Sequence, residues 1–296
     1  MALRRKMIHA TVPAPIQNSL IVGNNVDVLK TFQSDSIDVI VTSPPYDELR
    51  SYNGNYAVNL HDLGTEMFRI LKPGGICCLV MQDQTKNGHK TLTTFKTIID
   101  FCDSIGFGLF ETCIYKKFGN EGAWWSKRFR VDHEYIPIFV KGTRPAYFNK
   151  EPIKIPCKHA NKEMTGCATR LKDGTTLEST KVTINPTKCP GTIWDYSNGG
   201  DKNKMKREHP AVFPDKIPYD VIQVFCPPGG VVLDPMSGSG STVVGAQRLG
   251  MRFIGVDIEG KYMDICRRRL EAECGLVQPV TQFAPASPEE QTVPAP

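Results

Sequence analysis

A short β-branched run followed by two prolines constrains this chain most. Residues 37–41 read Ile-Asp-Val-Ile-Val, which predicts a buried parallel strand. Pro44 and Pro45 end that strand, because proline lacks an N–H donor and fixes φ. The strand therefore delivers Thr42-Ser43-Pro44-Pro45-Tyr46 to the carboxyl edge, where open α/β sheets bind ligands. Tyr46 can stack on a flat heterocycle, and Ser43 and the Pro44 carbonyl can accept hydrogen bonds from its amino group; a plain proline-rich turn is the alternative.

Strands and helices alternate over most of the chain. Hydrophobic runs predict strands at residues 19–22, 37–41, 76–81, 106–115, 135–140, 231–233 and 253–257. Apolar residues at helical spacing predict helices at residues 26–32, 61–71, 91–104, 218–225, 243–249 and 261–274. We expect Lys72 to Gly75 to end the second helix. The residues expected on the inner side of the third are Phe95, Ile98, Ile99, Phe101 and Cys102. The repeated order predicts an α/β fold with an open, doubly wound mixed sheet and an antiparallel edge at residues 106–140.

Length and composition predict either one large α/β domain or one domain with a sizeable insertion. Its 296 residues, 40% hydrophobic and 23% charged, suffice for a soluble core without disulfides. The ten cysteines are scattered and predict reduced thiols. We expect no metal, because Cys157, His159, Cys167 and Cys189 lack a Cys-x2-Cys pair. No apolar run has membrane-spanning length and none follows the basic amino terminus, so we expect a cytoplasmic protein.

Regular periodicity disappears between residues 141 and 208. This segment holds 14 Lys and Arg against 7 Asp and Glu, a net charge of +7, whereas the whole chain has +5. Such a segment is typical of an insertion that binds nucleic-acid phosphates and bases, although a solvated irregular subdomain is the alternative. Upstream, Trp124 and Trp125 repeat the mixture of aromatic and basic residues. The predicted DNA-binding side chains are Lys127, Arg128, Arg130, Lys202, Lys204, Lys206 and Arg207.

A glycine-rich stretch lies between a predicted strand and a predicted helix. Residues 234–242 read Asp-Pro-Met-Ser-Gly-Ser-Gly-Ser-Thr, and the glycines let the backbone turn sharply and approach a ligand. Asp257 ends the next strand, where a carboxylate can accept hydrogen bonds from ribose hydroxyls. A dinucleotide site fits nearly as well, but a third glycine is missing and Asp234 would repel a pyrophosphate. The same carboxylate favours S-adenosylmethionine, which carries an ammonium and a sulfonium.

Three motifs resemble those of the β group of DNA amino-methyltransferases. Residues 234–242 resemble the cofactor motif of that family, and Thr-Ser-Pro-Pro-Tyr resembles its catalytic motif. His-Pro-Ala-Val-Phe-Pro at residues 209–214 resembles the segment that helps enclose methionine. The catalytic motif comes first and the cofactor motif last, which is the permuted order of the β group. The resemblance spans residues 19–274, and the departures from the family pattern are Asn24, Met236 and Ser241.

The resemblance implies a circularly permuted Rossmann-like methyltransferase fold that binds S-adenosylmethionine. Together with composition it divides the chain into a flexible basic arm (1–18), a catalytic half (19–140), a DNA target-recognition insertion (141–208), a cofactor-binding half (209–274) and a disordered tail (275–296). The implied cofactor-binding residues are His209, Phe213, Pro214, Asp234, Pro235, Ser237, Gly238, Gly240, Ser241, Thr242 and Asp257.

The implied reaction is methyl transfer to the exocyclic amine of a flipped-out base in double-stranded DNA. The implied catalytic residues are Ser43, Pro44, Pro45 and Tyr46. The base stacks on Tyr46 while Ser43 and the Pro44 carbonyl accept the amine hydrogens, and positioning supplies the rate. Ser43 favours cytosine N4, with adenine N6 as the alternative.

Other classes stay open on the motifs alone. These are RNA methyltransferases, protein-glutamine methyltransferases, a nucleotide-binding dehydrogenase and a non-catalytic DNA-binding module. Glutamine methyltransferases carry the cofactor motif first, so motif order argues against them. The resemblance also implies a restriction-modification setting in a bacterium or a phage, a homodimer, and a cognate restriction endonuclease on a separate chain.

Overall fold

A nine-stranded sheet forms the centre of the molecule, in the order β14-β6-β7-β3-β2-β15-β16-β1-β17. The computed structural model describes residues 18–45, 58–117, 128–166, 168–177, 179–196, 204–209 and 212–283. The strands of the sheet are β1 (Ser19–Val22), β2 (Ile37–Thr42), β3 (Leu71–Leu79), β6 (Gly108–Lys116), β7 (His133–Val140), β14 (Ile193–Asp195), β15 (Val231–Asp234), β16 (Arg252–Asp257) and β17 (Val280–Gln282). β7 runs antiparallel to both of its neighbours, and the other pairs are parallel. The predicted doubly wound mixed sheet is confirmed.

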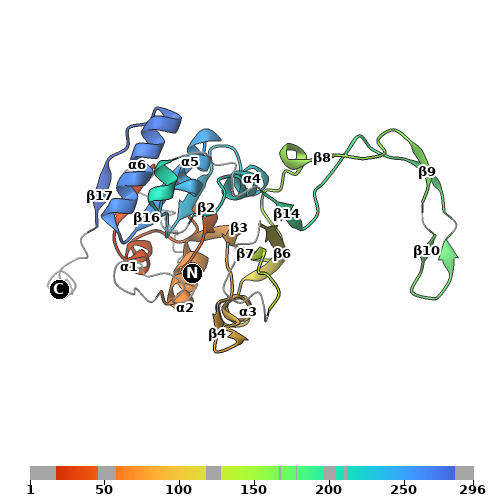
Figure 1. Cartoon of the computed structure of the whole chain (residues 1–296), viewed down its shortest axis with the longest axis horizontal. Coiled ribbons are helices and arrows are strands. Elements are labelled where there is room, and N and C mark those ends of the chain that lie inside the picture. Colours follow the sequence, from red (N-terminus) through yellow and green to blue (C-terminus); the bar gives the residue numbers. More distant parts are fainter. Residues whose placement is uncertain are drawn as a thin grey trace, which may run out of the picture.

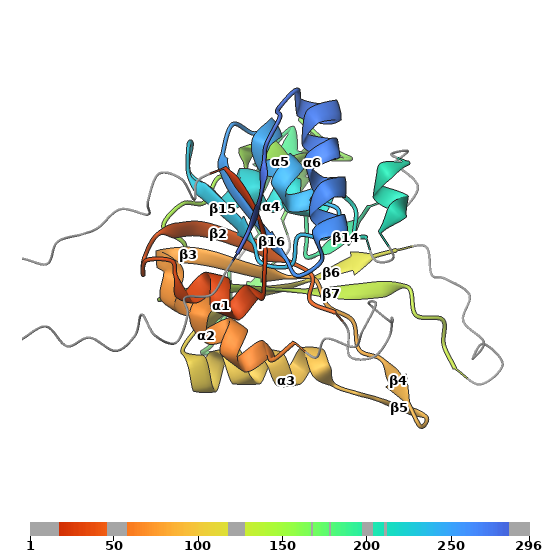
Figure 2. The ribbon, with the colours of Figure 1, turned by 90° about the vertical axis from the view of Figure 1, so that its left-hand side faces the viewer.

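Helices cover both faces of this sheet. They are α1 (Asn25–Lys30), α2 (Leu60–Ile70), α3 (Thr93–Ile99), α4 (Lys216–Phe225), α5 (Ser241–Arg248) and α6 (Gly260–Cys274). Figure 2 shows α4, α5 and α6 on one face and α1, α2 and α3 on the other. Within the described part of the chain, no helix is long and apolar enough to cross a membrane.

The two faces of the sheet build two hydrophobic cores. Side chains alternate along β3, so Ile76 and Cys78 pack beneath α4 to α6 while Cys77 and Leu79 pack against α1 and α2. The run is apolar throughout because both faces are covered. α2 begins where the Asn59 side chain accepts from the amides of His61 and Asp62, and it buries its apolar stripe in the second core.

The permuted topology brings distant segments together at the middle of the sheet. β2 lies between β3 and β15, although about 190 residues separate β2 from β15 in the chain. The Thr242 hydroxyl, from the start of α5, donates to the carbonyl of Val41 in β2 at 3.1 Å. The carboxyl ends of the catalytic and cofactor strands therefore meet at one edge.

Two helices differ in detail from the prediction. The predicted helix at residues 61–71 is α2 to within one residue at each end, but residues 72–75, expected to form a break after it, belong to β3. The backbone pairs there, because the Gly74 amide donates to Lys141 and the Gly74 carbonyl accepts from Ala146. The predicted helix at 91–104 is α3 followed by a π-helix at Asp100–Ile105.

The inner face predicted for that third helix is also partly wrong. Phe95 and Ile99 are 44% and 59% exposed, whereas Phe101 is fully buried. The Asp83 carboxylate accepts from the Thr94 amide at 2.8 Å and thereby fixes the start and rotation of α3. The π-helix then has one residue more per turn than an α-helix, so the residues after Ile99 that face the core no longer follow the spacing expected for a single α-helix.

The predicted disordered tail is wrong for its first residues. β17 pairs in parallel with β1, and the Phe283 amide donates to the Val22 carbonyl at 2.9 Å. Its composition is poor in apolar residues, but the open edge of β1 offers unpaired backbone groups that three residues can satisfy. Residues 284–296 of the tail and residues 1–17 of the predicted basic arm (1–18) lie outside the described residues.

The basic insertion is more regular than its composition indicated. Short antiparallel pairs follow one another outward: β8 (Ile155–Pro156) with β13 (Thr187–Lys188), β9 (Glu163–Thr165) with β12 (Lys181–Thr183), and β10 (Thr169–Arg170) with β11 (Thr176–Leu177). Figure 1 shows this projecting arm, residues 155–188, extending away from the sheet. β14 then returns to the sheet beside β6, so the β6 and β7 hairpin is not its edge as expected.

Candidate active site

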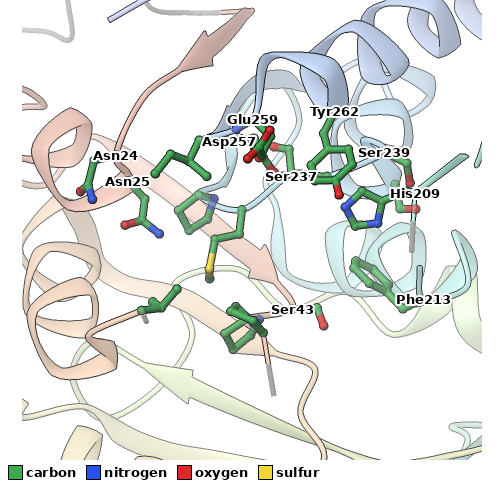
Figure 3. Close-up of a pocket in the computed structure, with 18 of the residues that line it drawn as sticks. Asn24, Asn25, Ser43, His209, Phe213, Ser237, Ser239, Asp257, Glu259 and Tyr262 are labelled. Atoms are coloured by element: carbon green, nitrogen blue, oxygen red, sulfur yellow. Dashed lines mark hydrogen bonds between the residues drawn. The ribbon is translucent and has the colours of Figure 1, made fainter. Parts of the chain in front are cut away.

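One cavity of about 640 Å³ lies at the carboxyl ends of the parallel strands. β1, β2, β15 and β16 all end there, and the segment after each strand contributes lining residues. Figure 3 shows Asn24, Ser43, Asp257, His209 and Phe213 around this space. Its size is that of a pocket for a ligand larger than a single base.

The turn after β15 forms the floor of the cavity. The Met236 amide donates to Asp234 Oδ1 at 3.1 Å, and the Ser237 hydroxyl donates to the Asp234 carbonyl at 2.9 Å. The Asp234 side chain is 1% exposed and lies behind the turn. Burial raises the pKa of Asp234 from 3.8 to about 6. Asp234 therefore shapes the turn and places a titratable charge beneath it.

Both glycines of the turn have positive φ angles, +48° at Gly238 and +82° at Gly240. A Cβ on Gly238 would lie 2.8 Å from Nε2 of His209, and a Cβ on Gly240 would collide with the Cys266 sulfur. Glycine is required at both positions by backbone conformation and by close packing. Gly238 also fixes how closely the His209 segment approaches the turn.

Asp257 joins the end of β16 to the glycine turn. Its Oδ2 accepts from the Gly238 amide and its Oδ1 from the Glu259 amide, both at 2.9 Å. Burial raises the pKa of Asp257 from 3.8 to about 6. Asp257 and Glu259 both line the cavity, so two carboxylates lie where ribose hydroxyls were expected. The ribose contact itself stays a prediction.

The predicted methionine-enclosing segment forms the opposite wall. His209 and Phe213 line the cavity, and the His209 ring packs edge-on against Tyr262 of α6 with 4.2 Å between ring centroids. The other predicted cofactor residues that line it are Pro235, Ser237, Gly238, Ser241 and Asp257. Pro214, Asp234, Gly240 and Thr242 lie behind the lining and support it.

The catalytic motif closes the remaining side. Ser43, Pro44 and Pro45 line the cavity directly after β2, as predicted. The Ser43 hydroxyl donates its hydrogen to the Val80 carbonyl at 3.1 Å. A hydroxyl that has given its hydrogen away presents its lone pairs as acceptors, which suits an incoming amine. Tyr46 lies outside the described residues.

The comparisons with known proteins agree with this geometry. A family model described as DNA methylase matches residues 37–268. The chain belongs to the DNA methylase family. The predicted family, enzyme class and fold are confirmed, and the methylase transfers a methyl group from S-adenosylmethionine to an exocyclic amine, cytosine N4 or adenine N6, in DNA.

Two relatives and one solved structure illustrate the match. The orphan methyltransferase M.BamHII of Bacillus amyloliquefaciens is 33% identical over 80% of this chain and 89% of its own. The DNA adenine methyltransferase YhdJ of Escherichia coli (strain K12) is 26% identical over 86% and 82%. The structure of the cytosine-N4-specific PvuII DNA methyltransferase has a TM-score of 0.63 at 20% identity, covering 84% of this chain and 85% of the other. This last likeness concerns the fold alone.

The residues of this methylase fit the cofactor. S-adenosylmethionine supplies a methyl group activated by a sulfonium. The cavity of about 640 Å³ has room for a nucleoside beside the glycine turn. Asp257 and Glu259 line it and Asp234 lies beneath the turn, so carboxylates surround the place of a cationic ligand. No group of three or more metal-ligating side chains occurs among the residues that the structure describes.

The predicted DNA-binding residues of the methylase divide into three groups. Arg128, Arg130 and Lys204 are exposed, as a contact with phosphate requires. Lys206 is placed differently from the prediction, because its side chain is 3% exposed and its amine binds Asp215 at 2.8 Å. A buried, paired lysine does not neutralise phosphates. Lys127, Lys202 and the Arg207 side chain lie outside the described residues, as do Trp124 and Trp125.

Several lining residues were not among the predicted site residues. Asn24 and Asn25 follow β1 at the same edge as Ser43 and Asp257, so their position after a predicted strand was an available signal. Glu259 and Tyr262 follow Asp257 by two and five residues. Lys117 and Glu134 come from the β6 and β7 hairpin, and no local pattern marked them.

Proposed function

We propose that this methylase acts on cytosine N4 in double-stranded DNA, with the target base flipped out beside Ser43. The observation that carries the choice of base is the serine directly before Pro44, whose hydroxyl is oriented as an acceptor by its bond to Val80. Ser43 and the Pro44 carbonyl accept the two amine hydrogens and so aim the nitrogen lone pair at the cofactor side of the cavity. Tyr46 stacks on the base ring.

Adenine N6 is the second candidate. The relative YhdJ is named a DNA adenine methyltransferase, whereas the structural neighbour PvuII is named cytosine-N4-specific. Both amines carry two hydrogens and a delocalised lone pair, so the same acceptors serve either base.

The test is direct identification of the methylated nucleoside. Duplex DNA is incubated with methyl-labelled S-adenosylmethionine, digested to nucleosides and separated. Label in N4-methylcytosine supports the proposal. Label in N6-methyladenine replaces cytosine with adenine, and absence of label from DNA of varied sequence contradicts transfer to DNA altogether.

The stacking step has its own variant. We expect Tyr46→Ala to lose about 10- to 100-fold in methyl transfer, because stacking of a base on an aromatic ring contributes about 1–3 kcal/mol. Cofactor affinity should stay unchanged, as measured by titration. Transfer at the wild-type rate would remove Tyr46 from the mechanism.

We further propose that residues 141–208 are the target-recognition insertion and that Lys127, Arg128, Arg130, Lys202, Lys204 and Arg207 contact DNA. Support comes from the exposure of the described members and from the net charge of +7 in the insertion. Salt-dependent binding to DNA, weakened by charge-removing variants at these positions, would test this assignment.

A homodimer is part of the same proposal. Phe95 and Ile99 of α3, with Leu92 directly before it, form an exposed apolar stripe with exposed fractions of 44%, 59% and 48%. Sedimentation of the purified protein distinguishes monomer from dimer, and a Phe95→Glu variant should shift the equilibrium to monomer.

The setting is proposed as bacterial or phage DNA modification in the cytoplasm, with a cognate endonuclease as a separate chain. The support is the resemblance to restriction-modification methyltransferases, and the relative M.BamHII is named an orphan. Protection of modified DNA against a nuclease encoded beside this chain tests the pairing.

A further inference from the structure

An enclosed ion pair lies on the wall of the cavity near Ser43. Lys117 directly follows β6 and Glu134 belongs to β7, and Lys117 Nζ lies 2.6 Å from Glu134 Oε1. The two side chains are only 14% and 12% exposed. Both residues line the same cavity as Ser43 and Pro44. Neither residue belongs to the catalytic motif or to the cofactor motif.

Gln82 connects the pair to the catalytic strand. Lys117 Nζ donates to Gln82 Oε1 at 3.4 Å, and Gln82 Nε2 donates to the His133 carbonyl at 3.1 Å. Val80, two residues before Gln82, is the acceptor of the Ser43 hydroxyl. The ammonium group is therefore held at the end of β3, next to the strand that delivers Ser43. An ammonium has three hydrogens, and these two acceptors account for two of them.

The neighbouring lysine makes a useful contrast. Lys116 lies 3.8 Å from Asp195, and these side chains are 57% and 69% exposed. That is an ordinary surface pair, which contributes little to stability. Enclosing Lys117 and Glu134 removes two charges from water, which costs free energy that their attraction repays only with good geometry. The β6 and β7 hairpin can close without such a pair. The position of Lys117 and Glu134 on the cavity wall therefore suggests that the pair acts on what the cavity binds.

We propose that Lys117 is a specificity-determining residue that donates to the ring acceptor beside the target amine, and that Glu134 and Gln82 hold it in position. The proposal rests on the proposed function of the same cavity. Cytosine places N3 next to its amine and adenine places N1 there, and both atoms are acceptors. Thymine and guanine carry an N–H at the corresponding ring position, which a lysine ammonium would oppose. Ser43, Pro44 and Lys117 thus match an amine next to an acceptor.

The first experiment compares Lys117→Met with Lys116→Met. Methyl transfer is measured on duplex DNA at saturating cofactor, with cofactor affinity and melting temperature measured on the same samples. We expect Lys117→Met to lower kcat/KM for DNA by about 10- to 100-fold, since it removes a charged hydrogen bond to the base. Lys116→Met should match the wild type. Unchanged kcat/KM in Lys117→Met would overturn the proposal.

A base analogue separates base contact from a structural role. One set of oligonucleotides carries the identified target base. The other carries an analogue in which a C–H replaces the ring acceptor: 3-deazacytosine for cytosine, or 1-deazaadenine for adenine. We expect the analogue to slow the wild type much more than it slows Lys117→Met. The variant has already lost the hydrogen bond between Lys117 and the ring acceptor, so the analogue removes nothing further from it. Equal slowing of the two proteins would mean that Lys117 only supports the hairpin.

Two further outcomes are decided by the same experiments. If Lys117→Met does not fold, Glu134→Gln replaces it in the comparison of target base and analogue. This change keeps the shape of the side chain but removes the ion pair that holds Lys117 in position. We then expect a smaller loss with the same coupling to the analogue, and additive effects would overturn the proposal. If the wild type labels no DNA, the proposed function fails in its own control, which is distinct from failure of Lys117.

Discussion

The cofactor-binding half and the projecting arm hold their charges in opposite ways. Arg269 on α6 is fully buried and binds Ser239, Asp215 and Glu273 through three hydrogen bonds of 2.8 to 2.9 Å. In the arm, every residue of the strands β8 to β13 is exposed. The exposed basic residues there are Lys158, Lys162, Arg170, Lys172, Lys181 and Lys188.

A positive charge serves the structure in the first region and is available to a ligand in the second. Arg269 connects the glycine turn, the start of α4 and the end of α6, so it fixes this wall of the cavity. The arm lacks a hydrophobic core of its own among the described residues, and its ladders hold it in shape. Substitutions should therefore affect stability and cofactor affinity in the first region, and only DNA affinity in the second.

The largest effect is expected for Arg269→Met. Removing the arginine breaks its buried pairs with Asp215 and Glu273, which keep Lys206 and Arg248 as partners, and breaking a buried pair costs about 3–5 kcal/mol. The free energy of unfolding from urea denaturation measures it. The matched control is Arg267→Met, on the same helix but with a 33% exposed side chain, and it should change stability by less than about 1 kcal/mol. Equal effects would remove the contrast between buried and surface charge.

The next effect concerns the pH dependence of stability. The pKa of Asp234 is raised to about 6, so the folded protein holds the proton more tightly than the unfolded chain does. Protonation stabilises the fold fully below about pH 4, and this contribution is lost as pH rises through about 6. Asp234→Asn does not ionise, so its stability relative to the wild type should rise by up to about 3 kcal/mol between pH 4 and pH 7. If the free energies of unfolding of the two cofactor-free proteins change in parallel with pH, the raised pKa of Asp234 is contradicted.

A smaller effect is expected at the glycine turn. Gly238→Ala forces a side chain into a left-handed conformation, which costs about 1–2 kcal/mol, and pushes against His209. We expect cofactor affinity to fall about tenfold because the wall moves. Gly250→Ala is the control, since Gly250 has φ of +69° but no atom within 4 Å of its Cβ position. It should lose a similar stability and keep cofactor affinity; if both variants lose affinity alike, contact with His209 is not the cause.

The sequence placed the main site residues because strand ends share an edge. Ser43, Asp234 and Asp257 each follow a β-branched run, and parallel strands bring their carboxyl ends together whatever their order in the chain. The motif alone could not tell which of these side chains face the cavity. Asp234 lies behind the turn and Asp257 lines the cavity, although both end strands in the same way.

Other features depended on pairing that no local pattern records. Lys117 meets Glu134 only through the antiparallel register of β6 and β7, and β17 forms only because β1 has an open edge. Three consecutive arginines, Arg267 to Arg269, look like one solvated run in the sequence. Each turns about 100° from the last, so Arg269 alone points into the core.

The smallest effect on stability is expected in the arm, where it sharpens the comparison most. Lys172 and Lys181 are exposed, and within the described residues neither makes a salt bridge within 4 Å. Lys172→Gln and Lys181→Gln should change the free energy of unfolding by less than about 0.5 kcal/mol.

The same two changes should nevertheless weaken binding to DNA. The slope of log affinity against log salt concentration is negative, and each phosphate contact that is lost reduces its magnitude by about 1. Fluorescence anisotropy on labelled duplexes at several salt concentrations measures that slope. Arg267→Gln removes an equal charge from α6 and should leave the slope unchanged. If all three variants reduce the slope alike, the contribution of the arm is that of net charge alone, and its lysines are not phosphate contacts.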